Sequence, residues 1–278
     1  CYIVRMFVHE ISSIAFSFGP VEVRWYGVMF AFGVLGYYFL TARLWKKEKW
    51  PMAHFDLAVG FLFFGLVIGA RLGEVFFYHP EYYLSEPLRI LRVWEGGLSS
   101  HGATIGLLVA YVLFWLWVRR GSGSSGSAGR IGFWKYVDLL VVCMPLVAGF
   151  VRIGNFFNSE IVGRASDLPW AVVFSLNGET FGRHPSQIYE AVLALGIFAF
   201  LFSSWVHRRG KDGRLEDWVK PGLFVFTFVG LYFLSRFGVE FFKEYQVVSD
   251  GVLTMGQWLS IVPVGIATIG MGWIFKRR

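Results

Sequence analysis

Seven long runs of predominantly apolar residues recur along the chain, separated by shorter segments that are richer in polar residues. Each run holds about 20 residues, which is the length that an α-helix needs to cross the hydrocarbon core of a bilayer. The pattern predicts an all-α polytopic membrane protein with about seven transmembrane helices. These spans are expected at 23–43, 55–79, 100–118, 134–152, 187–206, 221–242 and 255–275.

The connections between these runs differ in their content of lysine and arginine. Alternate connections, from 43–54 to the C-terminal tail, hold sixteen of these residues, whereas the connections between them and the N-terminal segment hold seven. Cytoplasmic connections of membrane proteins carry the excess of positive charge. The pattern therefore predicts an N-terminus outside and a C-terminus in the cytoplasm.

The polar segments are too short to form a second folding unit, so we predict a single transmembrane domain over 1–278. Residues 1–20 are amphipathic and end at a Gly-Pro pair, which indicates an interfacial segment. Residues 119–133 include a run of glycine and serine and are predicted to form a flexible cytoplasmic loop. Residues 153–186, with alternating apolar positions around 171–176, are predicted to form a small extracytoplasmic lobe with strand character.

The composition agrees with a membrane protein, because 55% of the residues are hydrophobic and only 16% are charged. The formal charge of +7 does not indicate a nucleic-acid partner, since most basic residues follow the membrane topology. The two cysteines, Cys1 and Cys143, are too few for a disulfide framework or a cysteine-based metal site. The histidines lack metal-binding spacings, so we predict neither a metal nor another cofactor.

Three arginines lie inside predicted helices, where a charged side chain is costly. Arg71, Arg152 and Arg236 fall in the second, fourth and sixth spans, each near the outward end and each followed two residues later by glycine. A guanidinium group carries a rigid fork of donors that matches phosphate. The three arginines therefore favour binding of a phospholipid headgroup in the outer leaflet. The alternative is that they hold helices together by ion pairs, Arg71 with Glu74, Arg152 with Glu160 and Arg236 with Glu240.

The other helices supply polar residues at the same outward level, whereas the cytoplasmic halves of the spans are nearly all apolar or aromatic. A transport pathway needs ionisable groups at the midplane and towards both sides of the membrane. One-sided polarity therefore favours chemistry at the outer interface over transport. The polar residues are Tyr26, His101, Gln187, Tyr189, Glu190 and Gln257.

Three of the outward segments hold candidate residues for binding or chemistry. His101 follows a glycine-rich stretch that lets the backbone approach a substrate, and a neutral imidazole can accept a proton from a thiol or hydroxyl. A histidine that only hydrogen-bonds at the interface fits its spacing equally well. Residues 152–164 gather two amides, a carboxylate and two guanidinium groups at a helix exit. Residues 184–190 are typical of a helix entry, with Pro185 in the first turn and Glu190 able to pair with an arginine.

Taken in order, these segments resemble the prolipoprotein diacylglyceryl transferase family. Each motif alone is modest, but the ordered set covers most of the chain and is highly specific. Three departures occur: Ala103 and Thr104 after His-Gly, Ser159 where glycine is frequent, and a short outer segment before His184. The matching motifs lie at 23–27, 69–73, 94–102, 152–164, 184–190, 236–242 and 255–260.

The resemblance implies a multi-pass enzyme of the bacterial inner membrane whose active site faces the outer leaflet. Its reaction would transfer the diacylglyceryl group from phosphatidylglycerol to the lipobox cysteine thiol of a prolipoprotein signal peptide and release glycerol phosphate. By position, Arg152 and Arg236 would hold the lipid phosphate, and His101 would be the base for the thiol. We expect a monomer. The residues expected to bind or orient the substrates are Tyr26, Arg71, Gly102, Asn155, Asn158, Glu160, Gly163, Gln187, Tyr189, Glu190 and Glu240.

Two other classes of function remain open on the residues alone. A lipid or anion transporter would use the same arginines without changing its cargo chemically. A non-catalytic lipid-binding scaffold would tolerate replacement of Arg152 and of His101. The one-sided polarity argues against the transporter, and the ordered motifs argue for the enzyme.

Overall fold

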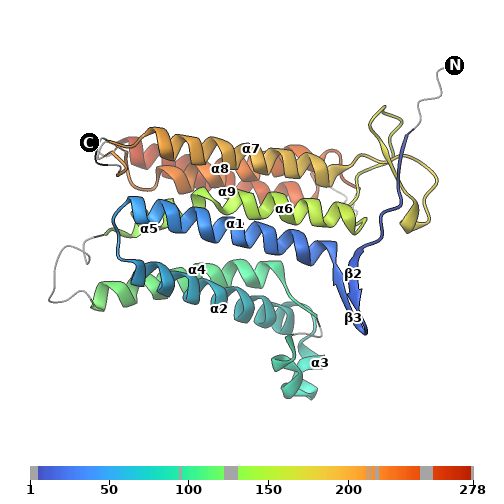
Figure 1. Cartoon of the computed structure of the whole chain (residues 1–278), viewed down its shortest axis with the longest axis horizontal. Helices are drawn as coiled ribbons and strands as arrows, with labels where there is room; N and C mark the ends of the chain where they lie inside the picture. Colours follow the sequence, from blue (N-terminus) through green and yellow to red (C-terminus); the bar gives the residue numbers. More distant parts are fainter. Residues whose placement is uncertain are drawn as a thin grey trace. The chain divides into compact units, whose positions relative to one another are not determined.

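A computed structural model describes residues 6–93, 96–121, 131–210, 212, 214–216, 219–244 and 253–276 (Figure 1). Seven helical segments in this part of the chain are long and apolar enough to cross a membrane, which confirms the predicted number of spans. The observed bounds differ from the predicted ones by a few residues, because helix ends do not coincide with the ends of apolar runs. The long helices are α1 (Trp25–Lys47), α2 (Met52–Phe77), α4 (Ser100–Gly121), α7 (Ser186–His207), α8 (Leu223–Glu240) and α9 (Met255–Lys276).

The fourth span is interrupted, which the sequence analysis did not predict. It consists of α5 (Phe133–Val142) and α6 (Met144–Phe157), with Cys143 between them. Pro145 lies in the first turn of α6, where a residue without a backbone N–H is tolerated and a new helix can begin. Helix α6 also extends five residues beyond the predicted end of the span, so that Arg152 lies within it rather than at its end.

The chain divides into two compact units, Cys1–Leu44 with Trp134–Arg278, and Trp45–Phe133. In the first unit α6 packs on α7, α7 on α8, and α8 on α9 (Figure 1). The buried carboxylate of Asp138, on α5, accepts hydrogen bonds from the backbone N–H groups of Gly222 (2.6 Å) and Val225 (2.9 Å). This carboxylate therefore caps the N-terminus of α8, where unpaired N–H groups need acceptors.

In the second unit α2 and α4 pack together through glycines (Figure 1). A Cβ atom added to Gly106 would lie 2.1 Å from the carbonyl oxygen of Gly65, and one added to Gly102 would lie 2.3 Å from that of Gly69. Small residues of this kind let two membrane helices approach backbone to backbone. Along α2 a third glycine, Gly73, continues the same stripe against Gly102.

Short strands and helices connect the spans. Strand β1 (Phe7–His9) pairs in parallel with β4 (Val172–Phe174), and β2 (Ile14–Phe18) forms an antiparallel hairpin with β3 (Val21–Arg24). Strand β4 confirms the strand character expected around 171–176, and it is followed by η4 (Ser175–Asn177). The second unit adds α3 (Pro80–Ser85) and η1 (Pro87–Leu91), which the sequence analysis did not predict.

Four predictions about the organisation of the chain stay predictions in whole or in part. The described part of 1–20 forms strands, and its location at the membrane interface stays a prediction. The predicted loop at 119–133 begins within α4 and ends at α5, and its residues 122–130 lie outside the described residues. The single domain and the extracytoplasmic position of 153–186 also stay predictions.

Candidate functional site

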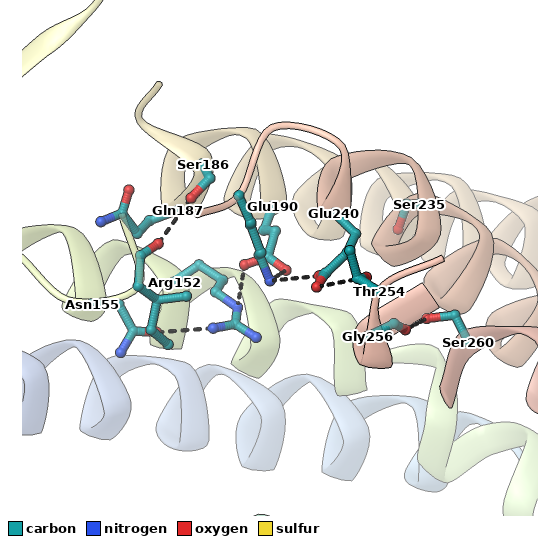
Figure 2. Close-up of polar contacts among 12 residues, drawn as sticks. Arg152, Asn155, Ser186, Gln187, Glu190, Ser235, Glu240, Thr254, Gly256 and Ser260 are labelled. Atoms are coloured by element: carbon teal, nitrogen blue, oxygen red, sulfur yellow. Dashed lines mark hydrogen bonds and ion pairs between the residues drawn. The ribbon is translucent and has the colours of Figure 1, made fainter. Parts of the chain in front are cut away.

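The centre of the polar cluster in the first unit is a carboxylate shared by two cations (Figure 2). Glu190 on α7 lies between Arg152 on α6 and Lys243, which follows the end of α8. The Arg152 Nε atom is 2.9 Å from Glu190 Oε2, an ion pair without the orientation of a hydrogen bond. The Lys243 ammonium donates a hydrogen bond of 2.8 Å to Glu190 Oε1. The arginine–Glu190 pairing expected from the sequence is therefore present.

The second carboxylate of the cluster, Glu160, is linked to Arg152 through an amide. Arg152 Nη1 donates to Asn155 Oδ1 at 3.3 Å, and Asn155 Nδ2 donates to Glu160 Oε2 at 3.1 Å. Asn158 Nδ2 donates to the other oxygen of Glu160, also at 3.1 Å. The polar residues of 152–164 are thus joined in one network. The expected direct pair between Arg152 and Glu160 is wrong, because α6 ends between the two residues and Asn155 fills the gap.

The backbone around Glu160 adopts an unusual conformation. Ser159 and Ile161, on either side, have φ angles of 55° and 56°, in the left-handed region that favours glycine. This conformation gives a physical reason why glycine would suit position 159. The hydroxyl of Ser159 lies 3.3 Å from Nδ1 of the buried His9, and burial lowers the pKa of that imidazole. Strained backbone of this kind persists only where the surroundings hold it, and functional sites are common places for it.

A third carboxylate, Glu240 at the end of α8, contacts the beginning of α9 (Figure 2). The hydroxyl of Thr254 donates to Glu240 Oε1 at 3.1 Å. Thr254 and Gln257 form a reciprocal capping box, in which each side chain accepts a hydrogen bond from the backbone N–H of the other. A Cβ atom on Gly256 would lie 2.4 Å from Glu240 Oε1, so the glycine leaves space for the carboxylate.

Arg236 and Arg152 line the same narrow cavity. Its other polar lining residues are Glu190, Tyr232 and Ser235. Among the described residues no ion pair or hydrogen bond reaches the guanidinium group of Arg236, and the expected pair with Glu240 is therefore wrong: Glu240 turns towards Thr254 and Lys243 instead. A cavity with two guanidinium groups and one carboxylate suits an anion.

Two other predicted site residues of the first unit lie beside this cluster, Tyr26 and Gln187. Tyr26 packs on α6, since a Cβ atom on Gly154 would lie 3.1 Å from its ring. Gln187 donates to the backbone carbonyl of Glu160, and its own Oε1 is buried without a hydrogen bond. Tyr189 lies apart from the cluster: its hydroxyl accepts a hydrogen bond of 2.8 Å from the Trp170 ring.

Gly163 has a packing reason to be glycine. A Cβ atom there would lie 2.5 Å from the carbonyl oxygen of His184 and 2.6 Å from that of Phe242. Gly163, which follows α6, therefore packs closely against His184 before α7 and against Phe242 after α8. Its contact with substrate stays a prediction. The sequence predicts Pro185 within the first turn of a helix. In the structure α7 begins one residue later, and Pro185 is the residue directly before it.

Arg71 in the second unit is surrounded by protein acceptors. Its Nε donates to the carbonyl of Ile90 (2.9 Å), and its Nη atoms donate to the Tyr83 hydroxyl (3.0 Å) and to backbone carbonyls. The expected pair with Glu74 is wrong, because Glu74 pairs with His79 at 2.9 Å. Arg71 therefore organises the segment between α2 and α4, and its predicted contact with substrate remains untested. The carbonyl acceptors of the Nη atoms are those of Arg89, Arg92, Gly96 and Gly97.

His101, also in the second unit, is exposed at the start of α4. Its Nδ1 atom lies 3.1 Å from the hydroxyl of Tyr78, which can orient the ring. A side chain at its neighbour Gly102 would collide with the backbone of α2, so helix packing accounts for that glycine. The roles of both residues towards substrate stay predictions.

Sequence reasoning missed Lys243 and Thr254 as members of the cluster. Lys243 is one of the seven basic residues in the outward segments, and it lies three residues after Glu240, about one helical turn away. Thr254 carried the signal of a capping box, because Gln257 follows it by three residues and precedes an apolar run.

The chain is similar over most of its length to a known protein family. Residues 13–273 match the family profile described as prolipoprotein diacylglyceryl transferase. A phosphatidylglycerol–prolipoprotein diacylglyceryl transferase of Tolumonas auensis is 38% identical over 89% of this chain and 90% of its own length. Proteins of the same name from Chloroherpeton thalassium and Geobacter sulfurreducens are 37% and 36% identical, over 94% and 97% of this chain. The matched regions make up 91% and 97% of the lengths of these two proteins, respectively.

Proposed function

Because the chain belongs to the prolipoprotein diacylglyceryl transferase family, we propose that it transfers the diacylglyceryl group of phosphatidylglycerol to the lipobox cysteine of a prolipoprotein. The cysteine sulfur forms a bond to the terminal glyceryl carbon of the lipid, and the bond between this carbon and the phosphate oxygen breaks. The electron pair of the broken bond stays on the phosphate, which leaves as glycerol phosphate. The product is a thioether-linked diacylglyceryl cysteine.

The observation that carries this proposal is the pair of guanidinium groups at one cavity, Arg152 and Arg236. Charge develops on the phosphate oxygen as the bond to carbon breaks, and fixed cations stabilise that charge in the transition state. Asn155, Glu160 and Tyr26 would hold Arg152 and the headgroup in position. Gln187, Glu190 and Glu240 complete the polar surroundings, and the contacts of Asn155 and Glu190 with Arg152 support this assignment.

The reaction also needs an acceptor for the thiol proton, for which His101 is the candidate by its place in the family motif. A free cysteine has a pKa of roughly 8.5, so the thiol needs only modest help from a neighbouring base near neutral pH. Arg71, Gly102, Asn158, Gly163 and Tyr189 complete the set of residues that we propose to shape the substrate surfaces.

The seven apolar helices make the protein a multi-pass membrane protein. We propose that it lies in the bacterial inner membrane with its N-terminus outside and its C-terminus in the cytoplasm, as the distribution of basic residues predicts. The polar cluster would then face the outer leaflet, where secreted prolipoproteins emerge. We also propose that it acts as a monomer, as a single transmembrane domain with an interfacial N-terminal segment and an extracytoplasmic lobe.

The proposal predicts a defined mass change. Purified protein in proteoliposomes that contain phosphatidylglycerol should convert a lipobox peptide to a product heavier by one diacylglyceryl unit, and glycerol phosphate should appear in equal amount. Mass spectrometry of the peptide and an enzymatic glycerol phosphate assay measure both products. A peptide with serine in place of cysteine is the control. Complete absence of the adduct, or movement of lipid across the bilayer without an adduct, would contradict the proposal.

A pH–rate profile tests His101. If its imidazole accepts the thiol proton, wild-type kcat should fall on the acidic side, where a protonated ring cannot act as a base. The His101→Gln variant should be slower by about 10²-fold, the usual contribution of a general base, and should lack this acidic limb. Tyr78→Phe, which removes the hydroxyl beside the ring, should have a smaller effect. Profiles of the same shape for wild type and His101→Gln would show that the histidine is not the base.

A further inference from the structure

Lys243 is a buried lysine at the centre of the cluster in the first unit. It is 8% exposed, and its ammonium lies 2.8 Å from Glu190 Oε1 and 3.8 Å from Glu240 Oε2. Its backbone is fixed as well, since its carbonyl accepts a hydrogen bond of 3.1 Å from Arg164 Nε. The ammonium group is therefore fixed in position between the carboxylates of Glu190 and Glu240, which compensate its buried charge.

Glu190 is the carboxylate that Lys243 shares with Arg152. One oxygen faces the lysine and the other faces Nε of the arginine, and all three side chains are at most 16% exposed. One negative charge between two positive charges leaves this trio with a net charge of +1. Arg152 also keeps donors unused: among the described residues, its Nη2 has no hydrogen-bond partner.

We propose that Lys243 is a positioning residue that keeps Arg152 available to the lipid phosphate. By holding one oxygen of Glu190, the lysine prevents both oxygens from turning to the guanidinium group in a bidentate pair, the geometry that arginine and carboxylate prefer. The inference rests on the proposed use of phosphatidylglycerol as the lipid substrate. It assigns to Lys243 an effect on lipid binding rather than on the chemical step.

Removal of the lysine charge should therefore change two properties of Arg152 together. Glu190 would be balanced by the arginine alone, so the net charge of this trio would fall from +1 to zero. Its freed oxygen would also compete with the phosphate for the Nη donors. Both effects weaken the binding of an anion in a buried site, where charges are poorly screened.

The test compares KM with kcat for phosphatidylglycerol at varied mole fraction in mixed micelles, with the lipobox peptide saturating. Lys243→Met should raise KM by about tenfold or more, the size expected for a buried charge partner, and change kcat by less than about threefold. Lys243→Arg should restore most of the wild-type KM. The double variant Lys243→Met/Glu190→Gln should also recover a low KM, because a neutral amide does not capture Arg152.

Three outcomes would overturn the inference: an unchanged KM in Lys243→Met, a loss in kcat alone, or a double variant as impaired as Lys243→Met. If Lys243→Met does not fold, Lys243→Ala provides the same comparison, since it also removes both the charge and the hydrogen-bond donor to Glu190 Oε1. Thermal-shift titration with dihexanoyl-phosphatidylglycerol gives a readout independent of activity. The affinities for this lipid should follow the same order as the KM values, with Lys243→Met the weakest. A wild-type protein that binds this lipid but forms no adduct would contradict the proposed function alone.

Discussion

Arg152→Gln is expected to reduce kcat/KM for diacylglyceryl transfer by about 10³-fold, the upper range for loss of one preorganised donor to a developing anion. Arg152→Lys should recover only part of this loss, because an ammonium keeps the charge but not the planar fork. Initial rates of peptide adduct formation in proteoliposomes measure both variants. The Arg152→Gln variant should still fold, since Lys243 remains to balance the charge of Glu190 after the arginine is removed.

Arg214 provides a matched control for this prediction. It is also an arginine, but its side chain is 52% exposed and its carboxylate partner Asp212 is 3.8 Å away. Arg214→Gln should therefore leave the rate within about twofold of wild type, because exposed ion pairs contribute little. If Arg152→Gln were no slower than Arg214→Gln, the assignment of the phosphate to Arg152 would be wrong.

Gly106→Ala is expected to destabilise the second unit by about 3 kcal/mol, at the upper end of the cost of overpacking. The added methyl group would lie 2.1 Å from the carbonyl oxygen of Gly65 and 2.8 Å from Cα of Gly69. Both contacts are with backbone, which cannot move aside as a side chain can. Helices α2 and α4 would have to separate, so the temperature at which the detergent-solubilised protein loses its monodisperse peak should fall.

Gly60, on α2, is the control for the change at Gly106. A Cβ atom at this position meets nothing within 4 Å. Gly60→Ala should therefore leave the melting temperature unchanged or slightly higher, because alanine favours helix more than glycine does. Equal melting temperatures for Gly60→Ala and Gly106→Ala would mean that close backbone contact does not hold α2 against α4.

The seven spans could be predicted from the sequence because a membrane span is a local property, a sufficient length of apolar residues. The break at Cys143 was missed because apolar residues continue on both sides of it, and only Pro145 marked the start of a new helix. The short helices α3 and η1 were also missed, since six or five residues carry too little periodicity to be recognised.

The partners of the charged residues could be predicted much less well. The alternative of ion pairs within the bundle joins Arg152 to the nearby Glu160, whereas the packing of α6 on α7 brings Glu190 to it. The sequence predicts that Glu190 can pair with an arginine but does not identify which one. The same alternative pairs Arg71 with Glu74 on its own helix, but Arg71 binds backbone carbonyls of the following segment, and such acceptors cannot be recognised in the residue pattern. What could be predicted was that polar residues of the fourth, fifth and sixth spans come together, as Arg152, Glu190 and Arg236 do at one cavity.

The parallel pairing of β1 with β4 imposes an order on biogenesis. Its two strands are at residues 7–9 and 172–174, and four of the seven spans lie between them in the chain. Strand β1 must therefore wait, after its own synthesis, until the fourth span and the segment beyond it have been synthesised. Closing so long a loop is slow compared with local helix formation. The backbone beside Glu160, where Ser159 contacts His9, would consequently reach its final conformation only after the fourth span has been made.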